Sequence, residues 1–367
     1  MTAKLSFTLL AAVSTFALAT AGCSKKADAP AAQAVTDAAA DMPAAATMPT
    51  AGAEMQKVLD HLALLGGKPI EILEPAEARK QPTPADAVKA LMKEQGMSTA
   101  PDPAVTTKNV TYPAGAGMQK ARVYVPTGVK GPMPVVLYIH GGGWVIADID
   151  VYDSSPRALA KATGAIIVSI EYRHAPEAKF PAAHDDANAA YQWVLANAAK
   201  WGGDPKKIAI VGESAGGNMA VDVAIAARDK GWAKPLAVVA VYPVANTSPD
   251  TASKKTFSQA KPLNTPMLTW FFKHTLSSPD QAADPRLNLV AAKLDGLPPT
   301  TIILAQIDPL HDDGTGLADK LRAAGVTVDL KEYAGVTHEF FGMGAVVPAA
   351  KEAEDYAAAK LKAAFGT

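Results

Sequence analysis

Short apolar runs that alternate with amphipathic stretches organise the chain beyond about residue 100. Six runs rich in Val, Ile and Ala have the length of buried strands, at 134–139, 165–170, 208–211, 236–242, 300–304 and 326–330. Patterns typical of helices lie between and after these runs, at 154–162, 182–199, 215–229, 314–324 and 349–365. Because such alternation favours right-handed crossovers, we predict a mostly parallel sheet with helices on both faces.

Two further regions add to this core. Residues 109–112 and 121–125 predict an antiparallel pair of strands, which brings the expected sheet to eight strands. Between residues 242 and 300 the spacing is too long for one crossover, and the aromatic-rich segment 266–272 predicts an inserted helix. That helix either belongs to the core or lines a pocket.

The segment that precedes the strands is expected to be helical. Val58, Leu59 and Leu62 share one face of a helix that begins near residue 55, and residues 85–95 predict a second amphipathic helix. Either both helices simply pack on the core, or they cover the mouth of an active site. We favour the second interpretation.

The first residues have the pattern of an export signal. Lys4 is followed by an apolar stretch at 5–19 and then by small residues, so we predict a signal peptide over residues 1–22. Cys23 follows Thr-Ala-Gly, an arrangement similar to the lipobox of bacterial lipoproteins, although Thr20 stands where Leu is commonest. This resemblance implies lipidation of Cys23 and an exported protein. Ser24, next to the cysteine, resembles the sorting pattern for the bacterial outer membrane, so we expect an anchor there, with the protein facing the periplasm or the surface. The alternative is an ordinary secretory signal followed by a chance cysteine.

Composition limits the partners and the order of the chain. Residues 23–53 are mostly small or polar and predict a flexible tether, whereas the whole chain is 49% hydrophobic and 19% charged, enough for a large core. The 35 basic and 36 acidic residues give a formal charge of −1, so we expect no nucleic-acid partner and membrane contact only through the lipid anchor. A single cysteine excludes an intrachain disulfide.

Ser214 is the strongest candidate for a nucleophile. It is the central residue of Gly212-Glu-Ser-Ala-Gly216, which fits the pattern G-x-S-x-G. The pentapeptide follows the predicted strand 208–211 and precedes the predicted helix 215–229. A serine on such a strand-to-helix turn has a strained backbone, and the small flanking glycines let strand and helix cross closely.

A glycine-rich loop supplies candidate donors for an oxyanion. His140-Gly-Gly-Gly-Trp144 directly follows the strand that ends at residue 139, and consecutive glycines allow backbone N–H groups to approach a ligand closely. We predict that the amides of Gly141, Gly142 and Ala215 form an oxyanion hole. A glycine triplet can also be a plain turn, but its position after a strand favours the functional interpretation.

Five ordered motifs resemble those of the hormone-sensitive-lipase-like esterases, and the resemblance extends over about residues 54–367. They are the segments 140–144, 172–183, 212–218, 308–314 and 338–342. The resemblance implies an α/β-hydrolase fold over 105–367, a helical cap built from 54–104 and an insertion at about 245–284, and hydrolysis of carboxylic esters of short acyl chains. Glu213 departs from the Asp often found there, and Glu339 stands where Gly is common.

A general base and an orienting acid complete the predicted site. The order Ser, acid, His requires a histidine beyond the acid, and His338 lies in the loop before the last helix. Asp308 follows the strand 300–304, and the family motif selects the same two residues. We expect Asp312 and Asp313 to be solvated alternatives and His311 to be a loop residue.

The remaining polar motifs predict structural roles. We expect His140 to brace its loop, and Arg173 and Glu177 to form a loop network. The segments 184–186 and 311–313 lack the ligand spacing of a zinc site, so we expect no metal and no cofactor. The predicted function is a serine carboxylesterase that acts on short- to medium-chain acyl esters through an acyl-enzyme. Hydrolysis of an amide, lactone or carbamate, and a non-catalytic receptor on the same fold, stay open as alternatives.

Overall fold

The computed structural model describes residues 48–115 and 117–367. The predicted signal peptide, Cys23 and most of the predicted tether lie outside these residues. Across the part of the chain that is described, no helix combines the length and the apolar composition needed to cross a membrane.

One sheet of eight strands forms the centre of the fold, in the order β1-β2-β4-β3-β5-β6-β7-β8. Its strands are β1 Val105–Ala114, β2 Gly117–Pro126, β3 Met133–Ile139, β4 Ile166–Ile170, β5 Gly203–Glu213, β6 Val238–Val241, β7 Thr300–Ile307 and β8 Val328–Thr337. β2 pairs antiparallel with both β1 and β4, and the other neighbours are parallel. The expected mostly parallel, eight-stranded sheet is therefore confirmed.

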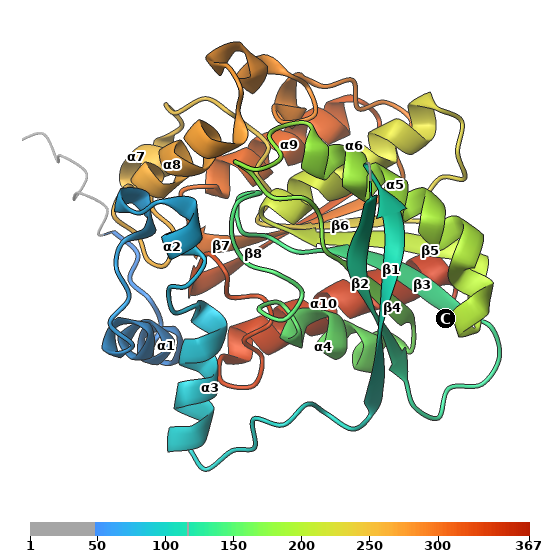
Figure 1. The fold of residues 1–367 in the computed structure, drawn as a ribbon, viewed down its shortest axis with the longest axis horizontal. Coiled ribbons are helices and arrows are strands. Elements are labelled where there is room, and N and C mark those ends of the chain that lie inside the picture. Colours follow the sequence, from blue (N-terminus) through green and yellow to red (C-terminus); the bar gives the residue numbers. More distant parts are fainter. Residues whose placement is uncertain (1–47, 116) are drawn as a thin grey trace, which may run out of the picture. The chain divides into compact units, whose positions relative to one another are not determined.

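Helices cover both faces of this sheet (Figure 1). Val135, Leu137 and Ile139 of β3 are buried with α5 Ala182–Asn197, α6 Ala215–Asp229 and α9 His311–Ala323. The intervening Val136 and Tyr138 are buried with α4 Ser154–Thr163 and α10 Pro348–Phe365. Because successive side chains of a strand point to opposite faces, a strand buried on both sides is a continuous apolar run rather than an alternating one.

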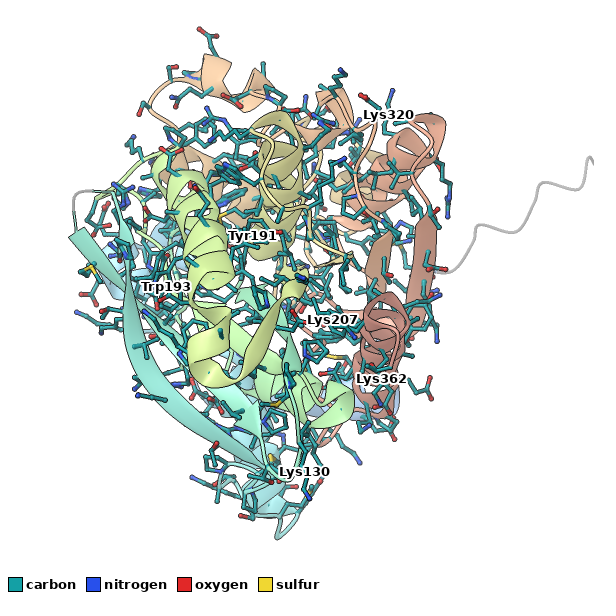
Figure 2. The ribbon with its side chains drawn as sticks, turned by 90° about the vertical axis from the view of Figure 1, so that its right-hand side faces the viewer. Lys130, Tyr191, Trp193, Lys207, Lys320 and Lys362 are labelled. Carbon is teal, nitrogen blue, oxygen red and sulfur yellow. The ribbon has the colours of Figure 1, made fainter. Side chains whose placement is uncertain are left out.

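Aromatic side chains of α5 join that helix to its neighbours. Tyr191 and Trp193 are labelled on α5 in Figure 2. The ring of Trp193 lies 5.7 Å from that of Tyr112 on β1, and the Tyr191 hydroxyl donates a 2.7 Å hydrogen bond to the Ala233 carbonyl. The first contact holds the antiparallel edge of the sheet against α5, and the second joins α5 to the loop between α6 and β6.

The segments expected to form a cap are largely helical. They comprise α1 Ala53–Leu64, the 3₁₀ turn Ile70–Ile72, α2 Pro75–Ala78, α3 Pro84–Glu94, α7 Ala252–Thr256 and α8 Thr265–Thr275. The Gly52 amide donates a 2.8 Å hydrogen bond to the Gly335 carbonyl, so the chain is already bound to β8 where α1 begins. α1 buries Met55 and Val58, and α3 begins with a capping box between Thr83 and Asp86.

Three local predictions are wrong. The helix expected from residue 314 begins at His311, which is therefore not a loop residue. Asp313 is fully buried rather than solvated. Its carboxylate lies 2.8 Å from Lys254 Nζ and accepts hydrogen bonds from the backbone amides of Ala245 and Asn246. Lys254 comes from α7, a partner that the local sequence around Asp313 does not reveal. The last strand also continues to Thr337, beyond the predicted end, because its exposed positions interrupt the apolar run.

Candidate active site

Ser214 lies on a strained turn between β5 and α6. Its backbone has φ 56° and ψ −117°, a conformation that non-glycine residues rarely adopt. The Ser214 amide donates to the Val241 carbonyl at 2.9 Å, and its carbonyl accepts the Asn218 amide at 3.0 Å. A Cβ atom at Gly212 would lie 2.0 Å from the Gly216 carbonyl oxygen, so the turn can close only around a glycine at that position.

The structure brings Ser214, His338 and Asp308 into one hydrogen-bonded chain. His338 Nε2 lies 3.0 Å from Ser214 Oγ, and His338 Nδ1 lies 2.7 Å from Asp308 Oδ2. Asp308 follows β7 and His338 follows β8, so parallel strands deliver both side chains to the edge where the serine turn lies. All three side chains are buried, and Asp308 Oδ1 also accepts the Leu310 amide at 2.8 Å.

The carboxylate sets the protonation of the imidazole. Burial by itself would lower the pKa of His338. The charge and hydrogen bond of Asp308, together with the charges of Glu339 and Glu213, outweigh burial and raise that pKa above its ordinary value. Because a carboxylate only accepts hydrogen bonds, Nδ1 carries the proton in the neutral ring. Nε2 is then free to accept the hydroxyl proton of Ser214.

The glycine loop, residues 140–144, follows the end of β3 and lies beside Ser214. Gly142 has φ 93° and Gly143 φ 57°, and both line the cavity in front of Ser214. A Cβ on Gly142 would lie 2.1 Å from the Ile146 carbonyl oxygen, which explains why this position requires glycine. Ala215 is the first residue of α6, so its amide belongs to the helix terminus, where N–H groups lack a partner within the helix.

Gly141 lies on the inner side of this loop. A Cβ on Gly141 would come within 2.3 Å of the Tyr152 hydroxyl and 3.2 Å of the Glu213 carbonyl oxygen. The amides of Gly141, Gly142 and Ala215 stay the predicted oxyanion donors. Gly143 is a further candidate that sequence reasoning missed, because the motif alone does not say which of the three glycines faces the cavity.

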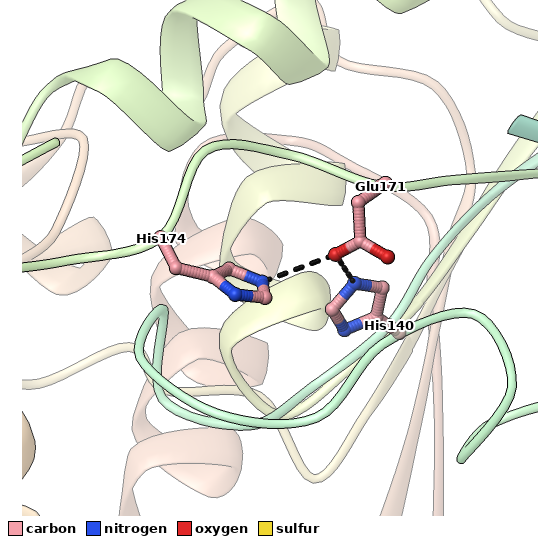
Figure 3. A group of neighbouring side chains, drawn as sticks. All are labelled: His140, Glu171 and His174. Atoms are coloured by element: carbon pink, nitrogen blue, oxygen red, sulfur yellow. Dashed lines mark hydrogen bonds and ion pairs between the residues drawn. The ribbon is translucent and has the colours of Figure 1, made fainter. Parts of the chain in front are cut away.

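His140 holds the glycine loop through a set of buried contacts. Its Nδ1 lies 2.9 Å from the Gly141 carbonyl, and its ring stacks on Tyr172 with centroids 4.4 Å apart. As Figure 3 shows, His140 Nε2 and His174 Nε2 both face Glu171 Oε1, each at 3.2 Å. Burial alone would raise the pKa of Glu171, but the two imidazoles outweigh it and lower that pKa. This arrangement braces the loop.

The same three side chains have the composition of a metal-ligand set, with their donor atoms within 4.8 Å of one another. Sequence spacing did not reveal the group, because His140 and Glu171 stand on different strand ends. The two segments considered from sequence have other partners. His184 Nε2 lies 2.9 Å from Asn218 Oδ1, and His311 Nε2 lies 2.7 Å from Glu332.

The expected loop network consists of two ion pairs. Arg173 lies 2.7 Å from the fully buried carboxylate of Asp186, and Arg79 forms a bidentate pair with Glu177. Arg79 also donates to the Val145 carbonyl at 2.8 Å, so α2 is joined directly to the segment behind the glycine loop. These residues position backbone and do not reach the serine.

A cavity of about 1260 Å³ opens over the serine. Ser214 and His338 lie in its wall, and the side chains that face them from the predicted cap are mainly apolar. They include Leu59 and Leu62 of α1 and Met267, Leu268, Phe271 and Phe272 of α8. α3 contributes only its first turn and buries its apolar face in the core beside α1. A substrate in this cavity therefore meets apolar side chains of α1 and α8, whereas polar side chains such as Gln56, Asp60 and Arg79 also line the wall.

Sequence comparison assigns the chain that carries this site to a known protein family. A family profile described as alpha/beta hydrolase fold matches residues 136–342, which include the glycine loop and all three members of the hydrogen-bonded chain. The chain belongs to the hormone-sensitive-lipase-like family of α/β-hydrolase esterases. It is a carboxylic ester hydrolase, and the expected fold class and family are confirmed.

Individual relatives agree in sequence and in fold. Carboxylesterase NlhH of Mycobacterium tuberculosis is 40% identical over 248 residues, which cover 66% of this chain and 78% of the relative. An ethyl acetate hydrolase of Pseudomonas putida is 33% identical over 288 residues, 77% of this chain and 88% of the relative. The crystal structure of a thermostable esterase from Pseudomonas putida ECU1011 is 34% identical and superposes with a TM-score of 0.77, covering 86% of this chain and 98% of that one.

Proposed function

We propose that this ester hydrolase works by nucleophilic catalysis, with Ser214 as nucleophile, His338 as general base and Asp308 as the residue that orients the imidazole. Two hydrogen bonds carry the proposal: His338 Nε2 lies 3.0 Å from Ser214 Oγ, and His338 Nδ1 lies 2.7 Å from Asp308 Oδ2. Ser214 Oγ attacks the ester carbonyl while its proton passes to His338 Nε2. Backbone amides of the glycine loop and of Ala215 hold the oxyanion. His338 then gives its proton to the departing alcohol, which leaves an acyl-enzyme for water to hydrolyse.

The proposed substrates are esters of short- to medium-chain acids. The cavity over Ser214 has an apolar wall formed by α1 and α8 and, at about 1260 Å³, is slightly larger than an ordinary small-molecule pocket, so it accommodates an acyl chain of several carbons. The ethyl acetate hydrolase among the relatives acts, by its name, on a two-carbon acyl group. Neither a charged side chain nor a metal is needed to recognise such a group.

The proposal is tested with p-nitrophenyl acetate, butyrate, octanoate and palmitate and with the matching butyryl anilide, using the protein from residue 48 onward. We expect kcat/KM to be highest for acetate or butyrate and to fall towards palmitate, with the anilide hydrolysed far more slowly. A preference for the anilide would favour amide hydrolysis. A folded protein inactive on every ester would favour the receptor alternative.

The acid side of the pH profile reports His338. Catalysis requires the neutral imidazole, and the pKa of His338 is raised above its ordinary value of about 6.5, mainly by Asp308 and further by the charges of Glu339 and Glu213. We therefore expect kcat/KM to fall as the pH drops, with an apparent pKa above 6.5. Asp308→Asn should move this pKa downward while lowering the rate. Profiles measured from pH 5 to 9 check both, and a profile without an acid limb would exclude His338 as the base.

We also propose that the full-length protein is exported and anchored through lipid on Cys23. The predicted signal over residues 1–22 and the cysteine that directly follows it support this proposal. Expressed in a bacterial host, the full-length protein should fractionate with the outer membrane and enter the detergent phase of a Triton X-114 extract. Cys23→Ala should remain in the aqueous phase. If both proteins entered the same phase, Cys23 would not be lipidated, and residues 1–22 would be an ordinary secretory signal.

A further inference from the structure

Glu339, the residue next to the proposed base, is built into the active site at a conformational cost. It has φ 68°, in the left-handed region where glycine is favoured and a glutamate is strained. Its carboxylate Oε1 lies 3.8 Å from His338 Nε2, the nitrogen that faces Ser214, and its side chain lines the substrate cavity. A strained acidic residue beside the reacting nitrogen calls for a chemical reason.

The contacts of this carboxylate leave part of it exposed, and Glu339 lines both the cavity over Ser214 and a smaller neighbouring cavity. The Tyr152 hydroxyl lies 2.7 Å from both Oε1 and Oε2, and one hydroxyl supplies only one hydrogen. A carboxylate has about four lone-pair positions, so most of its accepting capacity is unused by the contacts found in the described part of the chain. The side chain retains 22% of its surface exposed. Tyr152 thus holds the carboxylate in place without satisfying it.

We propose that Glu339 positions the water molecule that hydrolyses the acyl-enzyme. This inference rests on the proposed function of Ser214 and His338 and assigns a role within its second half-reaction. A water oxygen about 2.8 Å from each of His338 Nε2 and Glu339 Oε1 would complete a triangle whose base is the observed 3.8 Å. That water donates one hydrogen to the imidazole and the other to the carboxylate, which directs an oxygen lone pair at the acyl carbon.

The step balances without a further reactant. The water oxygen forms a bond to the acyl carbonyl carbon while its proton passes to His338 Nε2, and the carbonyl electron pair moves onto the oxyanion. The tetrahedral intermediate then breaks its bond to Ser214 Oγ, which recovers the proton from His338. Glu339 accepts a hydrogen bond throughout and takes no proton. It contacts the reacting water, whereas Tyr152 acts only by holding Glu339.

If Glu339 positions the water, its loss affects acylation and deacylation to different extents. In the acylation step with a p-nitrophenyl ester, the leaving group is a stable phenolate and no water takes part. Loss of Glu339 should therefore slow release of the acid much more than attack by Ser214. An effect exerted only through the charge of the imidazole would instead slow both steps, because His338 becomes cationic in each of them.

The test compares Glu339→Gln and Glu339→Gly with the parent protein on p-nitrophenyl butyrate. The glycine variant removes the left-handed strain, so it is not expected to fail in folding. We expect kcat to fall about 10- to 100-fold, a burst of up to one equivalent of p-nitrophenol, and a butyryl-enzyme visible by mass spectrometry. We expect kcat/KM to fall much less than kcat: the charge of Glu339 also helps to raise the pKa of His338, so its loss slows acylation too, but the water of the second half-reaction is lost in addition.

Tyr152→Phe is the matched control, since it removes the hydroxyl contact and keeps the carboxylate beside His338. We expect it to lose less than either Glu339 variant. Equal losses in kcat and kcat/KM, unchanged deacylation in the glycine variant, or a Tyr152→Phe defect as large as that of Glu339→Gln would each overturn the assignment. Failure of the proposed function itself looks different, because the parent protein would then show no serine-dependent acyl-enzyme at all.

Discussion

Ser214→Ala is expected to lower kcat/KM for p-nitrophenyl butyrate by about 10⁴-fold or more and to leave the fold intact. Ser214 Oγ is the only nucleophile that His338 Nε2 contacts, at 3.0 Å, among the residues that the structure describes. Without it no acyl-enzyme can form, and only slow attack by water assisted by the remaining groups is left. Because alanine removes one oxygen atom, the strained turn and its backbone hydrogen bonds persist.

Ser169→Ala provides the control for this experiment. Ser169 is a fully buried serine on β4, and its hydroxyl has no hydrogen-bond partner among the residues that the structure describes, so its removal should leave both activity and stability nearly unchanged. Steady-state kinetics and circular dichroism on the two variants separate a chemical effect from a structural one. Substantial activity in a pure, folded Ser214→Ala sample would refute nucleophilic catalysis by this residue.

Gly216→Ala is expected to destabilise the protein by about 3 kcal/mol or more, or to prevent folding, because an added methyl group has no space. A Cβ on Gly216 would lie 2.0 Å from the Ile139 carbonyl oxygen and 2.5 Å from that of His140. Both obstacles are backbone atoms at the end of β3, so α6 must move away from the sheet. That movement would shift Ser214 and the glycine loop together.

Gly316→Ala is the matched substitution within a helix. Gly316 lies in α9, and the nearest atom to an added Cβ is Val290 Cγ1 at 3.7 Å, an ordinary contact. Alanine is favoured over glycine in helices, so this variant should gain up to about 1 kcal/mol. Urea unfolding of both variants measures the difference. Equal stability of Gly216→Ala and the parent protein would show that α6 and β3 do not cross as closely as described.

The layered fold could be predicted because its signals are local. Continuous apolar runs of Val and Ile indicate strands buried on both faces, and the six predicted in this way correspond to β3 to β8. Boundaries were less certain where an edge strand has exposed positions, as in β8. The start of α9 was missed because His311, Asp312 and Asp313 resemble a polar loop until their partners are known.

The site was predictable in part for the same reason. Ser214 and the glycine loop are motifs in which sequence neighbours create the geometry, and the order of acid and base along the chain singled out Asp308 and His338. Contacts between distant segments were not accessible in this way. Tyr152 and Glu339 are 187 residues apart, and the burial of Asp313 depends on Lys254, which lies in the insertion.

The sequence by itself therefore determined the alternation of strands and helices, the family, and the residue types available for catalysis. Tertiary structure decided how those residues are used. The strand order places β3, β5, β6, β7 and β8 side by side in that sequence, so that loops from the ends of β3, β5, β7 and β8 meet around one serine. α1 and α8, which are far apart in the sequence, both line the cavity. Local patterns record which backbone conformation a segment prefers, whereas the pairing of distant segments depends on packing free energy summed over the whole core.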